Sequence, residues 1–175
     1  MSKIFFTADT HFNHSNIIKY ENRPFNNVHE MNEELIKRWN NKVGKNDRVY
    51  VLGDFAFDRD GTYVVELVRR LNGTIYLIKG NHDSYTKHRE AREVFGFVKD
   101  YYQLKYNNKA FILFHYPIAQ WDKAHHGSYH LYGHIHSNNQ DHHPMNFDLG
   151  RAMNVGVDVN NFEPVFIEDV INYLD

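Results

Sequence analysis

Seven side chains that can bind a divalent metal ion occur along this chain in short motifs. All but the last motif follow a short apolar run, and the last follows the shorter stretch at residues 130–132. Each position therefore predicts the end of a buried strand. Binding sites in open α/β sheets form outside the carboxyl ends of the strands, so we expect the motifs to converge. The candidate ligands are Asp9, His11, Asp54, Asn81, His115, His134 and His136.

The types of these side chains favour a pair of borderline metal ions. Two aspartates, one asparagine and four histidines, without a thiolate, suit manganese, iron or zinc. Seven protein ligands exceed what one tetrahedral ion takes, but they suit two ions about 3.5–4 Å apart that share a carboxylate. A lone aspartate after a strand is usually a turn or a helix cap, so the prediction depends on all the motifs occurring together.

The order of the motifs resembles that of the calcineurin-like metallophosphoesterase superfamily. Asp-x-His, Gly-Asp, Gly-Asn-His-Asp, His and Gly-His-x-His follow one another between Asp9 and His136, and the segment DTHFNHSNII is similar to a small bacterial and phage branch. The resemblance implies a metal-dependent phosphoric ester hydrolase with two divalent ions. It implies one ion held by Asp9, His11 and His136, a second held by Asn81, His115 and His134, and a bridge at Asp54.

The resemblance also implies a mechanism, in which a hydroxide that bridges the ions attacks the phosphorus directly, and His82 protonates the leaving oxygen. Asp54 and His82 are thus the expected catalytic residues. A carboxylate should keep His82 protonated near neutral pH, and Asp83 and Asp58 are both candidates. Ser/Thr phosphatases carry this carboxylate three residues after the bridging aspartate, followed by an arginine. This chain has Phe57 there, with Asp58 and Arg59 displaced by one, which leaves the partner of His82 open. The chain also has little room for substrate-binding loops, which disfavours protein phosphatase activity.

Two further residues are candidate substrate contacts. His14 lies in the first motif and could contact substrate or simply begin a helix. Arg23 precedes a proline and could bind phosphate through its guanidinium fork or form an ordinary surface ion pair. The remaining histidine pairs, 125–126 and 142–143, lie in polar segments and are expected to be solvent residues rather than ligands.

The pattern of apolar residues predicts an α/β fold. Strands are expected at residues 3–8, 48–52 and 75–79, with amphipathic helices at 27–42 and 61–71 between them. A hairpin at 101–114, strands at 130–132 and 152–159, and a helix at 167–174 follow. Two groups of strands and two helical regions suggest a sandwich of two mixed sheets flanked by helices. The family resemblance implies the same four-layer α-β-β-α arrangement, and the length predicts one domain over residues 1–175.

Composition narrows the class of protein. The chain has 175 residues, a hydrophobic content of 42%, a formal net charge of −2 and no cysteine. Disulfides and thiolate metal sites are excluded, and no global positive field indicates nucleic-acid binding. Neither a signal-peptide pattern nor a membrane-length apolar run is visible, which favours the cytoplasm.

The leading functional hypothesis is a phosphodiesterase that acts on a nucleotide or a similar small ester. Phosphomonoesterase activity is an alternative, although a monoester dianion requires extra cationic groups and only Arg23 lies near a motif. A nuclease acting on nucleic-acid ends would need a basic groove with stacking aromatics, and the charge balance disfavours it. A non-catalytic metal-binding module would not need His82.

Overall fold

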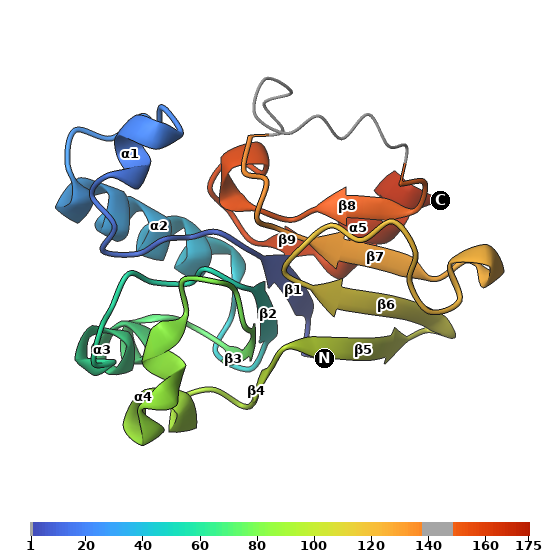
Figure 1. The fold of residues 1–175 in the computed structure, drawn as a ribbon, viewed down its shortest axis with the longest axis horizontal. Helices are drawn as coiled ribbons and strands as arrows, with labels where there is room; N and C mark the ends of the chain where they lie inside the picture. The colour runs from blue at the N-terminus through green and yellow to red at the C-terminus, as the bar shows by residue number, and fades with distance from the viewer. Residues whose placement is uncertain (1, 138–148) are drawn as a thin grey trace.

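The computed structural model describes residues 2–137 and 149–175, and it contains two sheets that pack against each other (Figure 1). The first sheet has the order β4-β3-β2-β1-β9. Its strands are β1 (Ile4–Thr7), β2 (Arg48–Leu52), β3 (Thr74–Ile78), β4 (Val98–Lys99) and β9 (Val165–Phe166). Strands β1 to β4 are parallel and β9 is antiparallel to β1, so the sheet is mixed.

The second sheet has the order β5-β6-β7-β8. It consists of β5 (Tyr101–Tyr106), β6 (Lys109–Phe114), β7 (Tyr129–Tyr132) and β8 (Ala152–Asn154). The β5–β6 hairpin turns at Asn107 and Asn108, both with positive φ, as the tightest hairpin turns require. Strands β6, β7 and β8 run parallel. The predicted pair of mixed sheets flanked by helices is confirmed.

Helices cover one face of the first sheet. The longer ones are α2 (Val28–Lys42) and α3 (Thr62–Arg70), and the shorter ones are α1 (Ile17–Tyr20) and α4 (Arg89–Glu93). Helix α2 begins with a side-chain cap, in which the Oδ1 of Asn27 accepts the N–H of Glu30 at 2.9 Å. Its buried stripe of Met31, Leu35 and Trp39 packs in one cluster with apolar residues of β1 to β3.

A second core lies between the two sheets. Alternate residues of β1 face opposite ways, so Phe5 belongs to the helix-side core while Ile4 and Phe6 belong to the inter-sheet core. The ring of Phe6 lies 6.0 Å from that of Phe111 on β6. Helix α5 (Ile167–Leu174) closes this core with Ile167, Val170 and Ile171. Burial of each such side chain contributes about 1.5–3 kcal/mol, and the two cores together fix how the sheets face each other.

One expected strand is shorter than its apolar pattern suggests. Strand β8 ends at Asn154 instead of continuing to residue 159, and Val157–Val159 forms a 3-10 helix. The cause is the Asn154 side chain, whose Oδ1 accepts the N–H of Gly156 at 2.8 Å and turns the backbone out of the sheet. This turn brings Asp158 toward the edge where the other strands end. In the part of the chain that the structure describes, every helix is too short or too polar to cross a membrane.

Candidate metal centre

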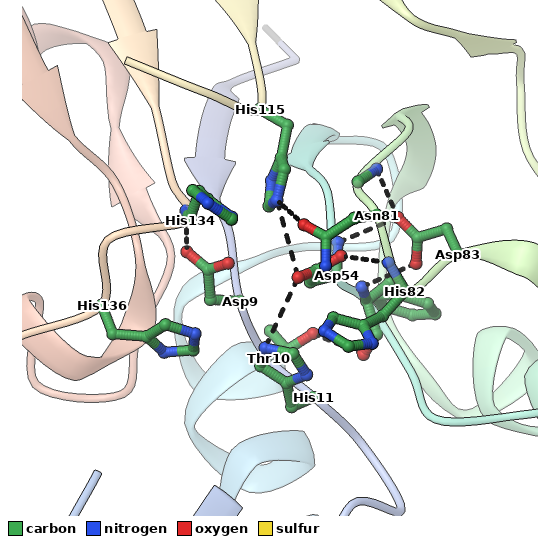
Figure 2. A network of polar contacts seen from close by, with 12 residues as sticks. Asp9, Thr10, His11, Asp54, Asn81, His82, Asp83, His115, His134 and His136 are labelled. Atoms are coloured by element: carbon green, nitrogen blue, oxygen red, sulfur yellow. Dashed lines mark hydrogen bonds and ion pairs between the residues drawn. The ribbon is translucent and has the colours of Figure 1, made fainter. Parts of the chain in front are cut away.

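The motif side chains point toward one another from loops that follow strands of both sheets (Figure 2). The first sheet brings Asp9 and His11 after β1, Asp54 after β2 and Asn81 after β3. The second brings His115 after β6 and His134 and His136 after β7. Two groups could each hold one ion, because their ligand atoms lie within 4.8 Å of one another. The first group is Asp9, His11 and His136, and the second is Asp54, His115 and His134.

The carboxylate of Asp54 lies between the two groups. Its Oδ2 is 3.7 Å from Nε2 of His11 in the first group and 3.5 Å from Nε2 of His115 in the second. Asn81 joins the second group, because its Oδ1 lies 3.1 Å from the same nitrogen of His115. The structure thus brings all seven predicted ligands together, with Asp54 in the central position that a shared carboxylate would need.

Five of these residues have a backbone conformation that side chains rarely adopt. The φ angles of Asp9, His11, Asp54, His134 and His136 lie between 45° and 72°, in the left-handed region. Each such residue costs of order 1 kcal/mol or more, and such strain gathers at functional sites. The loops are held by hydrogen bonds from His11 N to the Asp54 carbonyl at 3.0 Å and from His134 N to Asp9 Oδ2 at 2.8 Å.

The glycines of the three glycine-containing motifs are required by the closeness of the ligands. A Cβ on Gly53 would lie 2.3 Å from Nδ1 of His115, and one on Gly80 would lie 2.3 Å from Oδ1 of Asp54. A Cβ on Gly133 would lie 2.5 Å from Oδ2 of Asp9. Each motif therefore pairs a ligand with a glycine that leaves room for a ligand from another strand.

The buried polar atoms of the first group fit a cation. Asp9 Oδ1 and both ring nitrogens of His11 are buried and have no hydrogen-bond partner among the described residues. Unpaired polar atoms in a protein interior each carry a penalty of about 1–3 kcal/mol, and a bound divalent ion would remove it. Carboxylate oxygen and imidazole nitrogen are suitable donors for such an ion.

Burial and neighbouring histidines shift the pKa values of Asp9 and Asp54 in opposite directions. Burial raises the pKa of Asp9 from 3.8 to about 7, against the opposing effect of His136 and His115. Burial also acts on Asp54, but the hydrogen bond and charge of His115 and the charge of His11 outweigh it and lower its pKa to about 2. Burial lowers the pKa of His11 well below its usual value. Without a metal ion, the ring of His11 is therefore neutral and able to act as a ligand.

Hydrogen bonds at Nδ1 orient the rings of His115 and His136. Nδ1 of His115 lies 2.8 Å from the carbonyl oxygen of Leu52, and Nδ1 of His136 lies 2.9 Å from Oδ2 of Asp158. In both rings Nε2 is therefore the nitrogen that could bind a metal ion. Asp158 was not a sequence candidate, because it lies in NVGVDV, inside the last predicted strand at residues 152–159.

The location of Arg23 corrects its predicted role as a substrate contact. Its side chain is 0% exposed and forms a bidentate ion pair with Asp158, at 2.7 and 2.9 Å. It also donates to the carbonyl oxygens of Thr10 at 2.9 Å and Asp9 at 2.7 Å. A guanidinium enclosed in this way lies beneath the centre and is not a fork for substrate phosphate.

His82 lies exposed at the rim, and neither predicted carboxylate orients it. The ring of His82 is 5.5 Å from that of His11. The main-chain N–H of His82 donates to Asp54 Oδ1 at 2.8 Å. Asp83 is buried and accepts from the N–H groups of Asp54, Phe55 and Gly80 and from the Tyr85 hydroxyl. Asp83 thus ties together the loops after β2 and β3.

The other carboxylate candidate also has a different function. Asp58 accepts the N–H of Val64 at 3.0 Å, in the first turn of α3. The aromatic residue Phe57, which stands where a carboxylate was expected, is 45% exposed and lies 4.6 Å from the ring of His14. His14 itself is half-buried, 6.4 Å from the ring of His82, so it lies at the rim of the centre.

The remaining histidine pairs lie away from the ligands or cannot be placed. His125 and His126 are in the 3-10 helix Ala124–His126, which precedes β7, whereas His134 and His136 follow the other end of that strand. His142 and His143 lie outside the described residues.

A polar hollow beside the centre was not visible in the sequence. It has a volume of about 350 Å³ and includes Asn81 in its wall. Three cationic side chains, Lys79, Lys87 and Arg92, also line it. Lys79 is paired with Asp100 at 2.7 Å. The hollow places positive charge next to a predicted ligand.

An α/β sandwich that gathers aspartate, asparagine and histidine at the ends of its strands is the architecture of a metal-dependent phosphoesterase. Residues 3–157 match the calcineurin-like phosphoesterase superfamily domain, and the chain belongs to that superfamily. Members of this superfamily hydrolyse phosphate esters with divalent metal ions, and the candidate ligand groups of this chain agree with that chemistry.

Several proteins of other organisms are similar to this chain. An uncharacterized protein of Methanocaldococcus jannaschii is 39% identical, over 100% of this chain and 93% of its own length. The gene 66 protein of Mycobacterium phage L5 is 31% identical over 55% of this chain and 47% of its own length. The crystal structure of a protein of unknown function from Aquifex aeolicus has the same fold, with a TM-score of 0.77 and 21% identity over 99% of this chain and all of that one.

Proposed function

We propose that the chain is a binuclear metal-dependent phosphodiesterase for a nucleotide or a similar small ester. The observation that carries the proposal is the position of Asp54 between two groups of ligands, one of which contains buried polar atoms without partners. Asp9, His11 and His136 would hold one ion, Asn81, His115 and His134 the other, and Asp54 both. When bound, two divalent ions lower the pKa of a water toward neutrality and stabilise charge on the phosphate oxygens.

His82 is proposed to donate a proton to the leaving oxygen. Its main chain is fixed to Asp54, and its exposed ring stands beside His11 and His14 at the entrance to the centre. A general acid must reach the leaving group of the substrate, and an exposed ring at the rim can do so. His14 lies on the same side and is proposed to contact the substrate.

The surroundings favour a diester with an aromatic group, such as a nucleotide. Arg23 is enclosed beneath the centre and cannot clamp the extra charge of a monoester. The hollow beside Asn81, lined by Lys79, Lys87 and Arg92, is the feature that favours the alternative of a phosphomonoesterase. Two exposed aromatic rings flank the ligands: Phe57 beside His14, and Tyr116, 37% exposed, 4.6 Å from the ring of His134. Such rings can stack on a base, at about 1–3 kcal/mol per base. The same rings are the feature that favours the alternative of a nuclease acting on nucleic-acid ends.

The test is a substrate panel with the Mn²⁺-reconstituted protein. We expect two Mn²⁺ per chain and a larger kcat/KM for bis(p-nitrophenyl) phosphate than for p-nitrophenyl phosphate. A preference for the monoester would replace this proposal with a phosphomonoesterase. Full Mn²⁺ binding without turnover of any diester, monoester or oligonucleotide would indicate a non-catalytic metal module.

The aromatic rings allow the substrate class to be tested separately. Phe57→Leu and Tyr116→Leu should raise KM for dinucleotides several-fold, and they should leave the inhibition constant of dimethyl phosphate, a diester without a ring, unchanged. Tyr173→Leu is a matched control, because Tyr173 is an exposed ring (72%) on α5. Equal KM changes in the control would remove the stacking argument.

A further inference from the structure

A buried ion pair lies directly behind one ligand of the proposed centre. Arg23 and Asp158 are separated by 135 positions in the sequence, and their side chains are 0% and 4% exposed. Burying such a pair removes both charges from water, and an apolar pair of similar size is often as stable or more so. Stability alone therefore does not account for this pair, whereas its contacts with the ligands do.

The contacts tie together every member of the first ligand group. Asp158 Oδ2 lies 2.9 Å from His136 Nδ1, so the carboxylate fixes the orientation of the His136 ring. Arg23 donates to the carbonyl oxygen of Asp9 and to that of Thr10, which immediately precedes His11. One ion pair thus positions the loop after β1 and the loop after β7 relative to each other.

In the second ligand group, the atom that orients the histidine ring carries no charge. His115 uses the neutral carbonyl oxygen of Leu52 at the place where His136 uses a carboxylate. A carboxylate behind a ligating histidine fixes its tautomer and makes the ring a stronger donor than a carbonyl does. The two groups therefore differ in the charge of the residue behind their histidine, as well as in one ligand, which is the Asp9 carboxylate in the first group and the Asn81 amide oxygen in the second.

We infer that Arg23 and Asp158 are positioning residues that make the site of Asp9, His11 and His136 the tighter of the two metal sites. Metal ions then load in sequence, and the site of Asn81, His115 and His134 fills last. The inference rests on the proposed function only in that both groups bind ions, and it does not depend on the ester that is hydrolysed.

The first experiment is a Mn²⁺ titration of chelator-treated wild type and Asp158→Asn. Wild type should bind two Mn²⁺ with distinct affinities, and Asp158→Asn should weaken the tighter one by about 10- to 100-fold. Asp47→Asn is the matched control, since Asp47 is a buried carboxylate that accepts main-chain N–H groups of Lys3 and Gly44. It should lower the melting temperature and leave both Mn²⁺ affinities unchanged.

A second experiment shows whether Asp158 acts through His136. In a His136→Ala background, addition of Asp158→Asn should leave the affinity of the remaining Mn²⁺ unchanged. In a His115→Ala background, the same addition should still weaken the remaining Mn²⁺ by about 10- to 100-fold. Arg23→Lys keeps the charge but loses the fork, so it should give a smaller loss at the same site.

The outcomes separate the two proposals. Wild type that binds fewer than two Mn²⁺ contradicts the proposed binuclear function. Wild type that binds two Mn²⁺, with Asp158→Asn either unaltered or weakened equally at both sites, overturns the positioning role alone.

Discussion

Replacement of Asp9 by asparagine should have opposite effects on the stability of the metal-free protein and on metal binding. The carboxylate is buried, one of its oxygens has no partner among the described residues, and its pKa is raised to about 7. In the absence of metal, ionised Asp9 is therefore an unfavourable group in the folded state. The variant Asp9→Asn removes the charge but keeps the shape, including an oxygen that can accept the N–H of His134.

The expected gain in stability follows from the difference in the pKa of Asp9 between the folded and unfolded states. A rise from 3.8 to about 7, at about 1.4 kcal/mol per pKa unit, corresponds to a penalty of about 4 kcal/mol at neutral pH. The new amide N–H₂ also lacks a partner, so we expect roughly half of this gain, about 2 kcal/mol. For a chain of this length, that is a rise in melting temperature of about 4–8 °C.

The stability difference between Asp9→Asn and wild type should depend on pH. Between about pH 4 and pH 7 the folded wild type retains a proton on Asp9 that the unfolded chain has released, so rising pH destabilises the wild type. The advantage of Asp9→Asn should therefore be small near pH 4, grow with pH, and level off above pH 7.

The assay is denaturant unfolding of both proteins after chelation, at pH 5 and at pH 8, followed by the same measurement with saturating Mn²⁺. With Mn²⁺ the order should reverse, because wild type gains the binding free energy of an ion that the variant holds weakly. Asp47→Asn should be destabilised at both pH values. A chelated Asp9→Asn protein that is less stable than wild type at pH 8, or a gain independent of pH, would refute the reasoning.

Three further predictions concern catalysis and metal binding. Asp54→Asn removes the charge shared by the two ligand groups and should lower kcat by about 10²-fold or more with the fold intact, as checked by circular dichroism; near wild-type turnover would exclude a bridging role. His82→Ala should slow esters with alkoxide leaving groups by about 10²–10⁴-fold and activated aryl esters little, at unchanged Mn²⁺ content; an equal loss across graded leaving groups would exclude a general acid. Gly80→Ala places a Cβ 2.3 Å from Asp54 Oδ1 and should reduce Mn²⁺ binding, while Gly44→Ala, whose Cβ would lie 3.2 Å from the nearest atom, should not.

The convergence of the candidate ligands was predictable because each candidate is adjacent in sequence to the feature that positions it. An apolar run predicts the strand, a glycine predicts the tight turn, and the side chain that follows lies at the strand end. The turn glycines at 53, 80 and 133 are visible for this reason, and the structure adds that they also leave space for ligands from other strands.

The roles of Arg23 and Asp83 were not predictable from local sequence. The partner of Arg23 lies 135 positions away, and it approaches only because Asn154 ends β8 early. Asp83 follows His82 directly, but its carboxylate turns inward to four donors, including main-chain N–H groups after β2. Adjacency in sequence suggests that Asp83 contacts His82, whereas hydrogen bonds to residues of other loops decide where its carboxylate points.

The origin of the ligands in both sheets has a mechanical consequence. Asp9, His11, Asp54 and Asn81 extend from the first sheet, and His115, His134 and His136 extend from the second. In a chain without cysteine, ions held by these residues would act as a removable cross-link between the two layers. Separation of the layers at this edge and release of the ions then become a single event. Chelation would remove the cross-link at that edge, while the contacts of α5 with the inter-sheet core still hold the two sheets together elsewhere.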